Sequence, residues 1–290
     1  MFKDRKIAFI GPGVMGEAMI AGLIRQKVAG PEALIAAGPQ EDRLEYLRKQ
    51  YHIQTSLNNA EAACQADVVV LSVKPQRVDR VLAGLRGNIR ADALVLSIVA
   101  GASIEKISLG LGHDRIVRSM PNTPAQIGEG ITVWTAASRV TQEQKEMARQ
   151  ILSALGQEVL VEEENYLDMA TALSGTGPAY VFLFMEAMVD AGVHLGFPRR
   201  IAEQLVAQTV RGSVDYYATR DDPVHLARLR NEVTSPGGTS AAALYYLEKA
   251  GFRTAISRAI WAAYERSVEL GKSAKSHPPE QPAGPSSDTD

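Results

Sequence analysis

The chain has 290 residues, enough for about two domains, and its 46% hydrophobic and 22% charged residues are typical of a globular protein. Its 31 Lys and Arg residues against 33 Asp and Glu residues give a formal net charge of −2. That balance removes the long-range attraction that nucleic acid or an anionic membrane surface requires. We therefore expect no nucleic-acid partner.

The cysteine content and the lack of a long apolar run predict a cytoplasmic protein. The single cysteine, Cys64, cannot form an intrachain disulfide, and we expect it to be a small buried residue rather than a nucleophile. No run approaches the roughly 18–20 apolar residues that span a bilayer, so no membrane is expected as a partner. A first strand beginning by Lys6 leaves no room for a signal peptide before it.

The first half of the chain alternates short β-branched runs with helical stretches. Strands are predicted at Lys6–Ile10, Ala33–Ala37, Val68–Ser72, Leu94–Val99, Arg115–Ser119, Ile131–Trp134 and Gln157–Val161. Runs that are apolar at every position are expected when helices cover both faces of a mainly parallel sheet. The pattern predicts an α/β fold, with a doubly wound sheet of the Rossmann type over residues 1–163.

From Glu164 onward, strand-like runs vanish and apolar residues recur at helical spacing. This predicts an all-helical domain over residues 164–271, whose longest helices are Tyr180–Leu195 and Arg199–Ala218. Such a domain either buries part of its surface against a second copy or forms a bundle by itself, and periodicity does not separate the two. Residues 272–290 hold four prolines and few apolar residues, which predicts a disordered tail.

A glycine-rich turn follows the first predicted strand. Gly11, Gly13 and Gly16 have the GxGxxG spacing and precede a helical stretch. In a dinucleotide site the first glycine makes the tight turn, the second lets the backbone approach a pyrophosphate, and the third lets helix and strand pack closely. The alternative is a turn that only connects two elements.

The end of the second predicted strand favours NADPH over NADH. NAD-preferring folds carry Asp or Glu about 20 residues after the third glycine, whereas Ile35–Pro39 contains no carboxylate. Its absence removes a repulsion against a 2′-phosphate. Glu41 and Asp42 are close, however, and only Arg43 offers a positive charge, so NADH is also possible.

Three segments combine hydroxyl residues with glycine or proline: Ser119–Pro124, Ser174–Pro178 and Thr234–Ser240. The last precedes a predicted helix, where hydroxyls and free backbone N–H groups suit a small carboxylate. The alternative for each segment is ordinary helix capping.

None of His52, His113, His194 or His225 adjoins these segments, although reduction of a ketone would need a general acid. A ring imine can instead be protonated by solvent before hydride arrives, which favours a C=N substrate. Glu162–Glu164 is interpreted as a solvated linker, and no metal is expected.

Several segments together resemble the pyrroline-5-carboxylate reductases, and the likeness runs from about Lys6 to Gly271. They are Ile10–Glu17, Val73–Gln76, Met120–Pro124, Leu173–Tyr180 and Val233–Ser240. The resemblance implies hydride transfer from NADPH, or NADH, to the C=N bond of L-1-pyrroline-5-carboxylate, giving L-proline in the last step of proline biosynthesis. It also implies a homodimer through the helical domain, or an assembly of five dimers.

The same resemblance implies the site residues. The cofactor contacts are Ile10, Gly11, Gly13, Val14, Met15, Gly16, Gly38, Asn59, Ser72, Val73, Lys74, Pro75, Ile98, Val99 and Ala100. The substrate contacts are Asn122, Ser235, Gly237, Gly238, Thr239 and Ser240. Ser240 stands where the family usually has Thr, and its hydroxyl is the expected catalytic partner of the ring nitrogen.

Two other classes of protein are alternative interpretations, because they have the same two-domain plan. A β-hydroxyacid dehydrogenase would need a catalytic lysine early in the helical domain, and Gly177–Phe182 contains none. A non-catalytic dinucleotide-binding sensor would not need the hydroxyl and glycine segments of the second half.

Overall fold

The computed structural model describes residues 2, 5–220 and 224–273. The predicted break at Asp221–Pro223 and most of the predicted tail, from residue 274 on, lie outside the described residues. Packing divides the chain into unit 1, Met1–Thr171 with Tyr264–Asp290, and unit 2, Ala172–Ala263. The domain limits at residues 163 and 271 stay a prediction.

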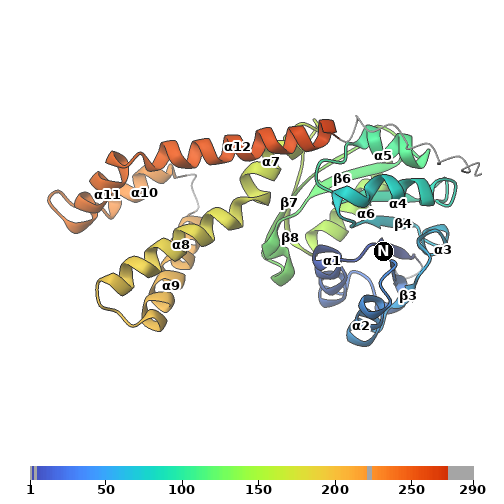
Figure 1. The fold of residues 1–290 in the computed structure, drawn as a ribbon, viewed down its shortest axis with the longest axis horizontal. Helices are drawn as coiled ribbons and strands as arrows, with labels where there is room; N and C mark the ends of the chain where they lie inside the picture. Colours follow the sequence, from blue (N-terminus) through green and yellow to red (C-terminus); the bar gives the residue numbers. More distant parts are fainter. Residues whose placement is uncertain (1, 3–4, 221–223, 274–290) are drawn as a thin grey trace, which may run out of the picture. The chain divides into compact units, whose positions relative to one another are not determined.

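Unit 1 contains one eight-stranded sheet in the order β3-β2-β1-β4-β5-β6-β7-β8 (Figure 1). The strands are β1 (Ile7–Ile10), β2 (Leu34–Ala37), β3 (Gln54–Ser56), β4 (Val68–Leu71), β5 (Leu94–Ser97), β6 (Ile116–Met120), β7 (Gly130–Ala136) and β8 (Gly156–Leu160). Neighbouring strands are parallel except for β6 and β7, which are antiparallel. The mainly parallel sheet is confirmed, but the sequence prediction missed β3, a short and partly exposed edge strand.

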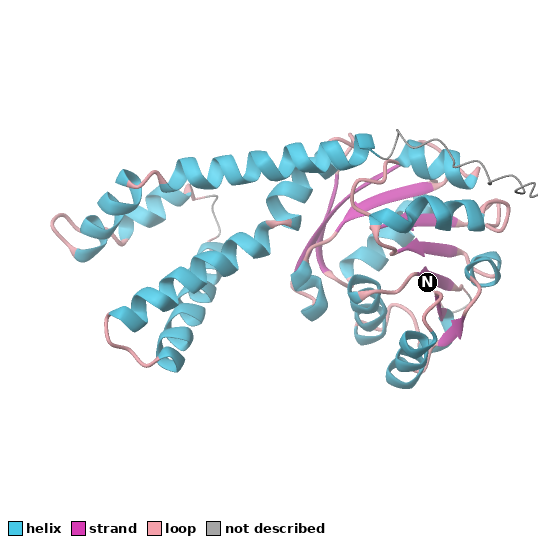
Figure 2. Cartoon of the chain, in the orientation of Figure 1, coloured by secondary structure: helices cyan, strands magenta, loops and turns pink. Residues whose placement is uncertain are grey.

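Helices cover both faces of the sheet, as Figure 2 shows. They are α1 (Val14–Arg25), α2 (Glu41–Tyr51), α3 (Asn59–Cys64), α4 (Val78–Leu85), α5 (Ile104–Leu111), α6 (Gln142–Ser153) and α7 (Tyr166–Ala170). Phe9, Val70 and Leu96 pack with α1, α2 and α6, whereas the neighbouring positions Ile10 and Leu71 pack with α3, α4 and α5. This alternation of strand side chains between two buried layers explains why the strands are apolar throughout.

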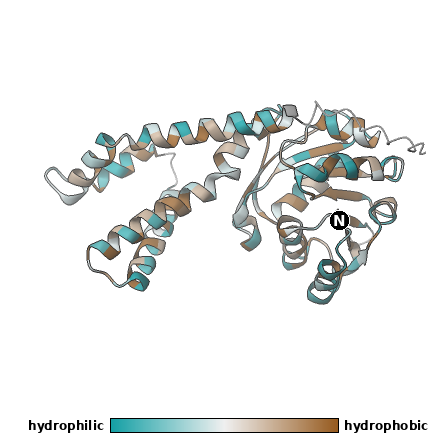
Figure 3. Cartoon of the chain, in the orientation of Figure 1, coloured by the Kyte–Doolittle hydropathy of each residue, from teal (hydrophilic) through white to brown (hydrophobic). Residues whose placement is uncertain are grey.

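The regular elements described after unit 1's sheet are all helical, which confirms the predicted second half. They are a π-helical turn at Thr171–Gly175, α8 (Gly177–His194), α9 (Arg199–Ala218), α10 (Leu226–Glu232), α11 (Thr239–Lys249) and α12 (Phe252–Ser273). The buried core of unit 2 is small and centres on Val189, Ala202 and Val206. Large side chains on α8 are exposed, among them Phe182 and Leu183, and Figure 3 shows the apolar stretches of this helix.

One helical stretch bears on the expectation that no apolar run is long enough to span a bilayer. The helical stretch Tyr166–His194, 29 residues long, is apolar enough to cross a membrane, and little of it is buried within the chain. One such stretch is weak support for a membrane span, because a helix face that packs against a second subunit has the same composition.

Two residues lie in other surroundings than expected. Cys64 is exposed rather than buried, because α3 turns Ala62 and Ala63 inward and places the thiol near the Glu61 carbonyl oxygen, 3.2 Å away. Glu164 is not simply a solvated linker residue, since its carboxylate pairs with the buried Arg118.

Candidate cofactor and substrate sites

Most of the predicted cofactor residues follow the carboxyl ends of adjacent parallel strands. Ile10 of β1 is in register with Ala37 of β2 on one side and Leu71 of β4 on the other, and Leu71 pairs with Ser97 of β5. The segments that follow these four strands therefore meet at one edge of the sheet. In open α/β sheets this edge is where ligands bind.

Two glycines of the turn are required by close packing. Gly11 has φ +72°, and a Cβ added there would lie 2.3 Å from Cγ1 of Val73. A Cβ at Gly16 would lie 2.9 Å from Oγ of Ser72. The same Ser72 hydroxyl donates to the carbonyl oxygen of Ile10 at 3.0 Å. The end of β4 thus fixes the turn against β1.

The middle glycine is open instead. Gly13 is exposed, and no atom lies within 4 Å of an ideal Cβ at this position. It is the N-cap of α1 and has no side-chain cap, so the first amides of the helix are available to an anion. The space and the donors fit a pyrophosphate that approaches the backbone closely.

An ion pair fixes α1 to α2 beside this turn. Arg43 of α2 lies 2.5 Å from the Glu17 carboxylate and donates through Nε to the Pro12 carbonyl oxygen at 3.1 Å. Burial alone raises the pKa of the Glu17 carboxyl, but hydrogen bonds from Tyr51, Arg43 and Tyr46 outweigh it and lower the pKa overall. Burial and the bond to Glu17 raise the pKa of Tyr51 to about 12. The cation that the sequence offers near the adenosine end is therefore already paired with Glu17.

Other predicted cofactor residues have local roles of their own. The Gly38 N–H donates to the Ser56 carbonyl oxygen at 3.2 Å, and the Val99 N–H donates to Ser97 Oγ at 3.2 Å. Oδ1 of Asn59 is buried without a hydrogen-bond partner in the described part of the chain. Lys74 is exposed and is the third residue after the end of β4. Their contacts with a cofactor stay predictions.

The predicted substrate segment lies in unit 2 at the start of α11. Gly238 is the N-cap, and no side chain caps the helix. Gly237 has φ +71° and open space where a Cβ would be, and Thr239 and Ser240 are the first two helical residues. In the structure, therefore, no hydroxyl side chain caps α11. Its first backbone amides and the hydroxyls of Thr239 and Ser240 are left for a ligand.

The two other hydroxyl segments are used within the fold. Ser119 Oγ is buried and donates to the Ser97 carbonyl oxygen at 3.0 Å, and Oδ1 of Asn122 accepts the Ile131 N–H at 3.0 Å. Ser174 lies in the π-helical turn before α8, and the Thr176 carbonyl oxygen accepts the Ala179 N–H at 3.0 Å. The role of Asn122 toward a substrate stays a prediction.

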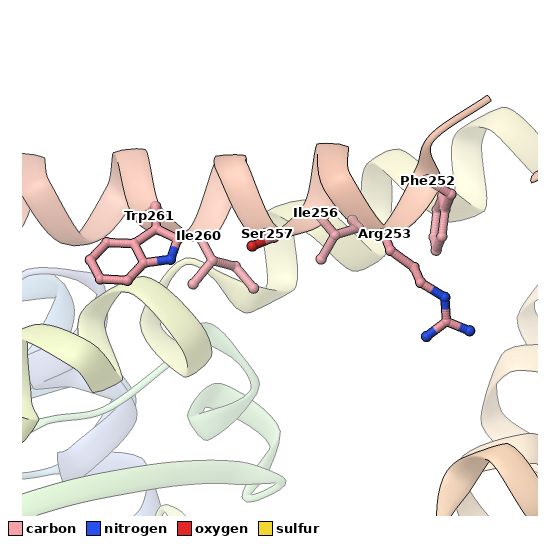
Figure 4. Close-up of a pocket in the computed structure, with 6 residues that line it drawn as sticks. All are labelled: Phe252, Arg253, Ile256, Ser257, Ile260 and Trp261. Atoms are coloured by element: carbon pink, nitrogen blue, oxygen red, sulfur yellow. The ribbon is translucent and has the colours of Figure 1, made fainter. Parts of the chain in front are cut away.

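Sequence reasoning missed an apolar hollow along α12. It is lined by Phe252, Arg253, Ile256, Ser257, Ile260 and Trp261. Figure 4 shows these side chains on one side of the helix, where the spacing i, i+4, i+8 brings Phe252, Ile256 and Ile260 into line. This i, i+4, i+8 spacing is the feature of the sequence from which the apolar hollow could have been predicted.

The doubly wound sheet and the glycine-rich turn after its first strand are typical of a dinucleotide-dependent oxidoreductase. The curated pyrroline-5-carboxylate reductase of Synechocystis sp. is 46% identical over 92% of this chain and 98% of its own length. The enzyme of that name from Pseudomonas aeruginosa is 40% identical over 92% and 97%. The chain belongs to the pyrroline-5-carboxylate reductase family.

Family profiles and solved structures agree with this assignment. The profile for pyrroline-5-carboxylate reductase dimerisation matches residues 164–270, and that for coenzyme F420-dependent NADP oxidoreductases matches residues 6–101. The pyrroline carboxylate reductase of Plasmodium falciparum with NADP bound has a TM-score of 0.85 and 33% identity, covering 93% of this chain and all of that one. The Coxiella burnetii pyrroline-5-carboxylate reductase has a TM-score of 0.84 and 36% identity over 92% and 98%.

Replacement of Gly13 by valine is expected to weaken dinucleotide binding strongly without unfolding the chain. The side chain would occupy the open space that the pyrophosphate needs, and we expect the cofactor Kd to rise by about 100-fold. Calorimetric titration with NADP⁺ and a thermal melt would measure both quantities. Gly16→Val is the contrasting control, because its clash with Ser72 should lower Tm as well. Unchanged cofactor affinity in Gly13→Val would refute this placement of the pyrophosphate.

Replacement of Glu17 by glutamine tests the ion pair beside the turn. A lowered carboxyl pKa stabilises the fold above the ordinary value of 4.5, and this contribution is lost as pH falls through the lowered pKa. Glu17→Gln should therefore be less stable than the parent by about 1 kcal/mol at pH 7, and the gap should close below about pH 4.5. Urea unfolding across pH measures this, with exposed Glu41→Gln as control. A gap independent of pH would contradict the electrostatic explanation.

Proposed function

We propose that this chain reduces the C=N bond of L-1-pyrroline-5-carboxylate to give L-proline. Membership of the pyrroline-5-carboxylate reductase family over nearly the whole chain is the observation that carries this proposal. The two substrate-side requirements of the reaction are a holder for a carboxylate and a hydrogen-bond partner for the ring nitrogen. The segment at the start of α11 offers both.

The proposed binding of the substrate uses the uncapped start of α11. Backbone amides after Gly237 and Gly238 hold the carboxylate at the positive end of the helix dipole. The Ser240 hydroxyl donates or accepts a hydrogen bond at the ring nitrogen, with Ser235 and Thr239 beside it in the same segment. Because solvent can protonate the imine, the segment needs no acidic side chain of its own.

NADPH is the proposed cofactor, and when bound it supplies the hydride. Support comes from the NADP-bound relative, from the NADP oxidoreductase profile over residues 6–101, and from the absence of a carboxylate at Gly38, directly after β2. The glycine-rich turn holds the pyrophosphate, and the segments after β4 and β5 hold the rest of the nucleotide. A 2′-phosphate would have to share Arg43 with Glu17.

The assembly is proposed to be a homodimer through residues 164–271, with a decamer of five dimers as the larger form. The dimerisation profile and the exposed apolar side chains of α8 and α12 support it. A cytoplasmic location is proposed with it, since the only cysteine is an unpaired thiol.

Oxidation of NADPH and of NADH should be measured side by side with pyrroline-5-carboxylate as substrate. We expect turnover with both and a kcat/KM about tenfold higher with NADPH, because no carboxylate follows β2 to repel the 2′-phosphate. A preference for NADH would overturn the cofactor proposal alone. No measurable oxidation of either cofactor would overturn the proposed reaction.

Loss of the Ser240 hydroxyl should slow the reaction without weakening cofactor binding. We expect Ser240→Ala to lower kcat/KM for the imine by about 10- to 100-fold, the range for one lost hydrogen bond at the reacting atoms. The Kd for NADP⁺ should stay within about twofold. Ser240→Thr restores the hydroxyl and is the matched control. Equal losses in turnover and cofactor affinity would contradict the assigned role.

A further inference from the structure

A buried arginine in unit 1 has a partner on each side. Arg118 of β6 is 5% exposed, and its Nη1 donates to Oε1 of Glu164 at 2.8 Å. Its Nη2 donates to Oδ1 of Asp168, in α7, at 3.4 Å. A guanidinium is costly to remove from water unless it is paired, so both carboxylates are needed where they stand.

Each carboxylate connects the arginine to a further element. Oε1 of Glu164 also accepts the N–H of Ile104, the first residue of α5, at 2.8 Å. Oδ1 of Asp168 accepts a hydrogen bond from the hydroxyl of Ser267 in α12, at 2.8 Å, and Ser267 is 5% exposed. We call Arg118, Glu164, Asp168 and Ser267 the Arg118 cluster. It joins β6, α5, α7 and the last turns of α12.

The loop between β5 and α5, residues 98–103, is held at both of its ends. Ser97 Oγ accepts the Val99 N–H at its start, and Glu164 accepts the Ile104 N–H directly after its last residue. In between, an ideal Cβ on Gly101 would lie 3.5 Å from backbone atoms of Leu270 and Gly271, so α12 passes the loop at a distance that one side-chain carbon would fill. The same loop contains Ile98, Val99 and Ala100.

We propose that the Arg118 cluster positions the β5–α5 loop for the nicotinamide half of the cofactor, with Glu164 as the positioning residue that acts directly on the loop. This inference rests on the proposed function, which assigns Ile98, Val99 and Ala100 to the cofactor. The loop follows β5, in the second mononucleotide-binding half of the sheet. A displacement of the order of 1 Å in such a segment is enough to impair hydride transfer or binding.

Glu164 differs in this respect from its two neighbours in the acidic run. Glu162 and Glu163 are exposed, and the hydrogen bonds that involve them use their backbone carbonyl oxygens. Glu163→Ala is therefore a matched control that removes one carboxylate from the same run. Glu164→Gln keeps an oxygen that can accept the Ile104 N–H but removes the charge that faces Arg118.

Steady-state kinetics of the full-length enzyme, well below the Tm of each variant, test the inference. For Glu164→Ala we expect KM for NADPH and Kd for NADP⁺ to rise about tenfold, which equals about 1.4 kcal/mol. KM for pyrroline-5-carboxylate should stay within about twofold. Glu163→Ala should match the parent, and Glu164→Gln should recover NADPH affinity to within about threefold. A purely structural role would lower Tm without this split between the two substrates.

A second variant keeps the inference testable if Glu164→Ala does not fold. Ser267→Ala removes one hydrogen bond to Asp168 and leaves both ion pairs of Arg118 in place, and we expect a two- to fourfold rise in KM for NADPH. If Glu164→Ala folds and its NADPH affinity is unchanged, the inference is overturned. If only Ser267→Ala folds, unchanged NADPH affinity in that variant overturns it. In either case an active parent enzyme leaves the proposed function in place. A parent enzyme that neither binds nor oxidises NADPH would overturn the proposed function, and the inference with it.

Discussion

The close approach of β1 and β4 around the glycine-rich turn is the constraint on which the rest of unit 1 depends. Val73 and Ser72, the two residues that follow β4, occupy the space that side chains at Gly11 and Gly16 would need. Only a chain without Cβ atoms at these two positions can turn from β1 into α1 against that strand. Gly13, which lies between these two glycines in the turn, has open space around its Cα instead.

Paired charges hold the elements around this edge of the sheet. Arg43 with Glu17 joins α2 to α1 beside the turn, and Arg118 with Glu164 joins β6 to the start of α5. In both pairs the carboxylate also accepts hydrogen bonds from other groups, which offsets the cost of partial burial. These charges therefore join specific neighbouring elements rather than add to a general surface attraction.

Unit 2 is helical and leaves much of its apolar surface exposed. Its own core is small, while large side chains such as Phe182, Leu183 and Trp261 are exposed. A single chain leaves this apolar area in water at a cost of about 25 cal/mol per Å². Residues 164–270 match the profile for pyrroline-5-carboxylate reductase dimerisation, and the exposed apolar side chains of α8 lie within this match.

Local spacing determined much of this protein. The glycine-rich turn, the apolar strands and the helix Arg199–Ala218 are all visible in the order of residues, because turns, buried strands and amphipathic helices each have a short period. Tertiary structure alone decided the rest. The edge strand β3, the exposure of Cys64 and the pairing of Glu164 with Arg118 depend on contacts between segments far apart in the chain. A short polar strand or a carboxylate in an acidic run has no local pattern that reveals its distant partner.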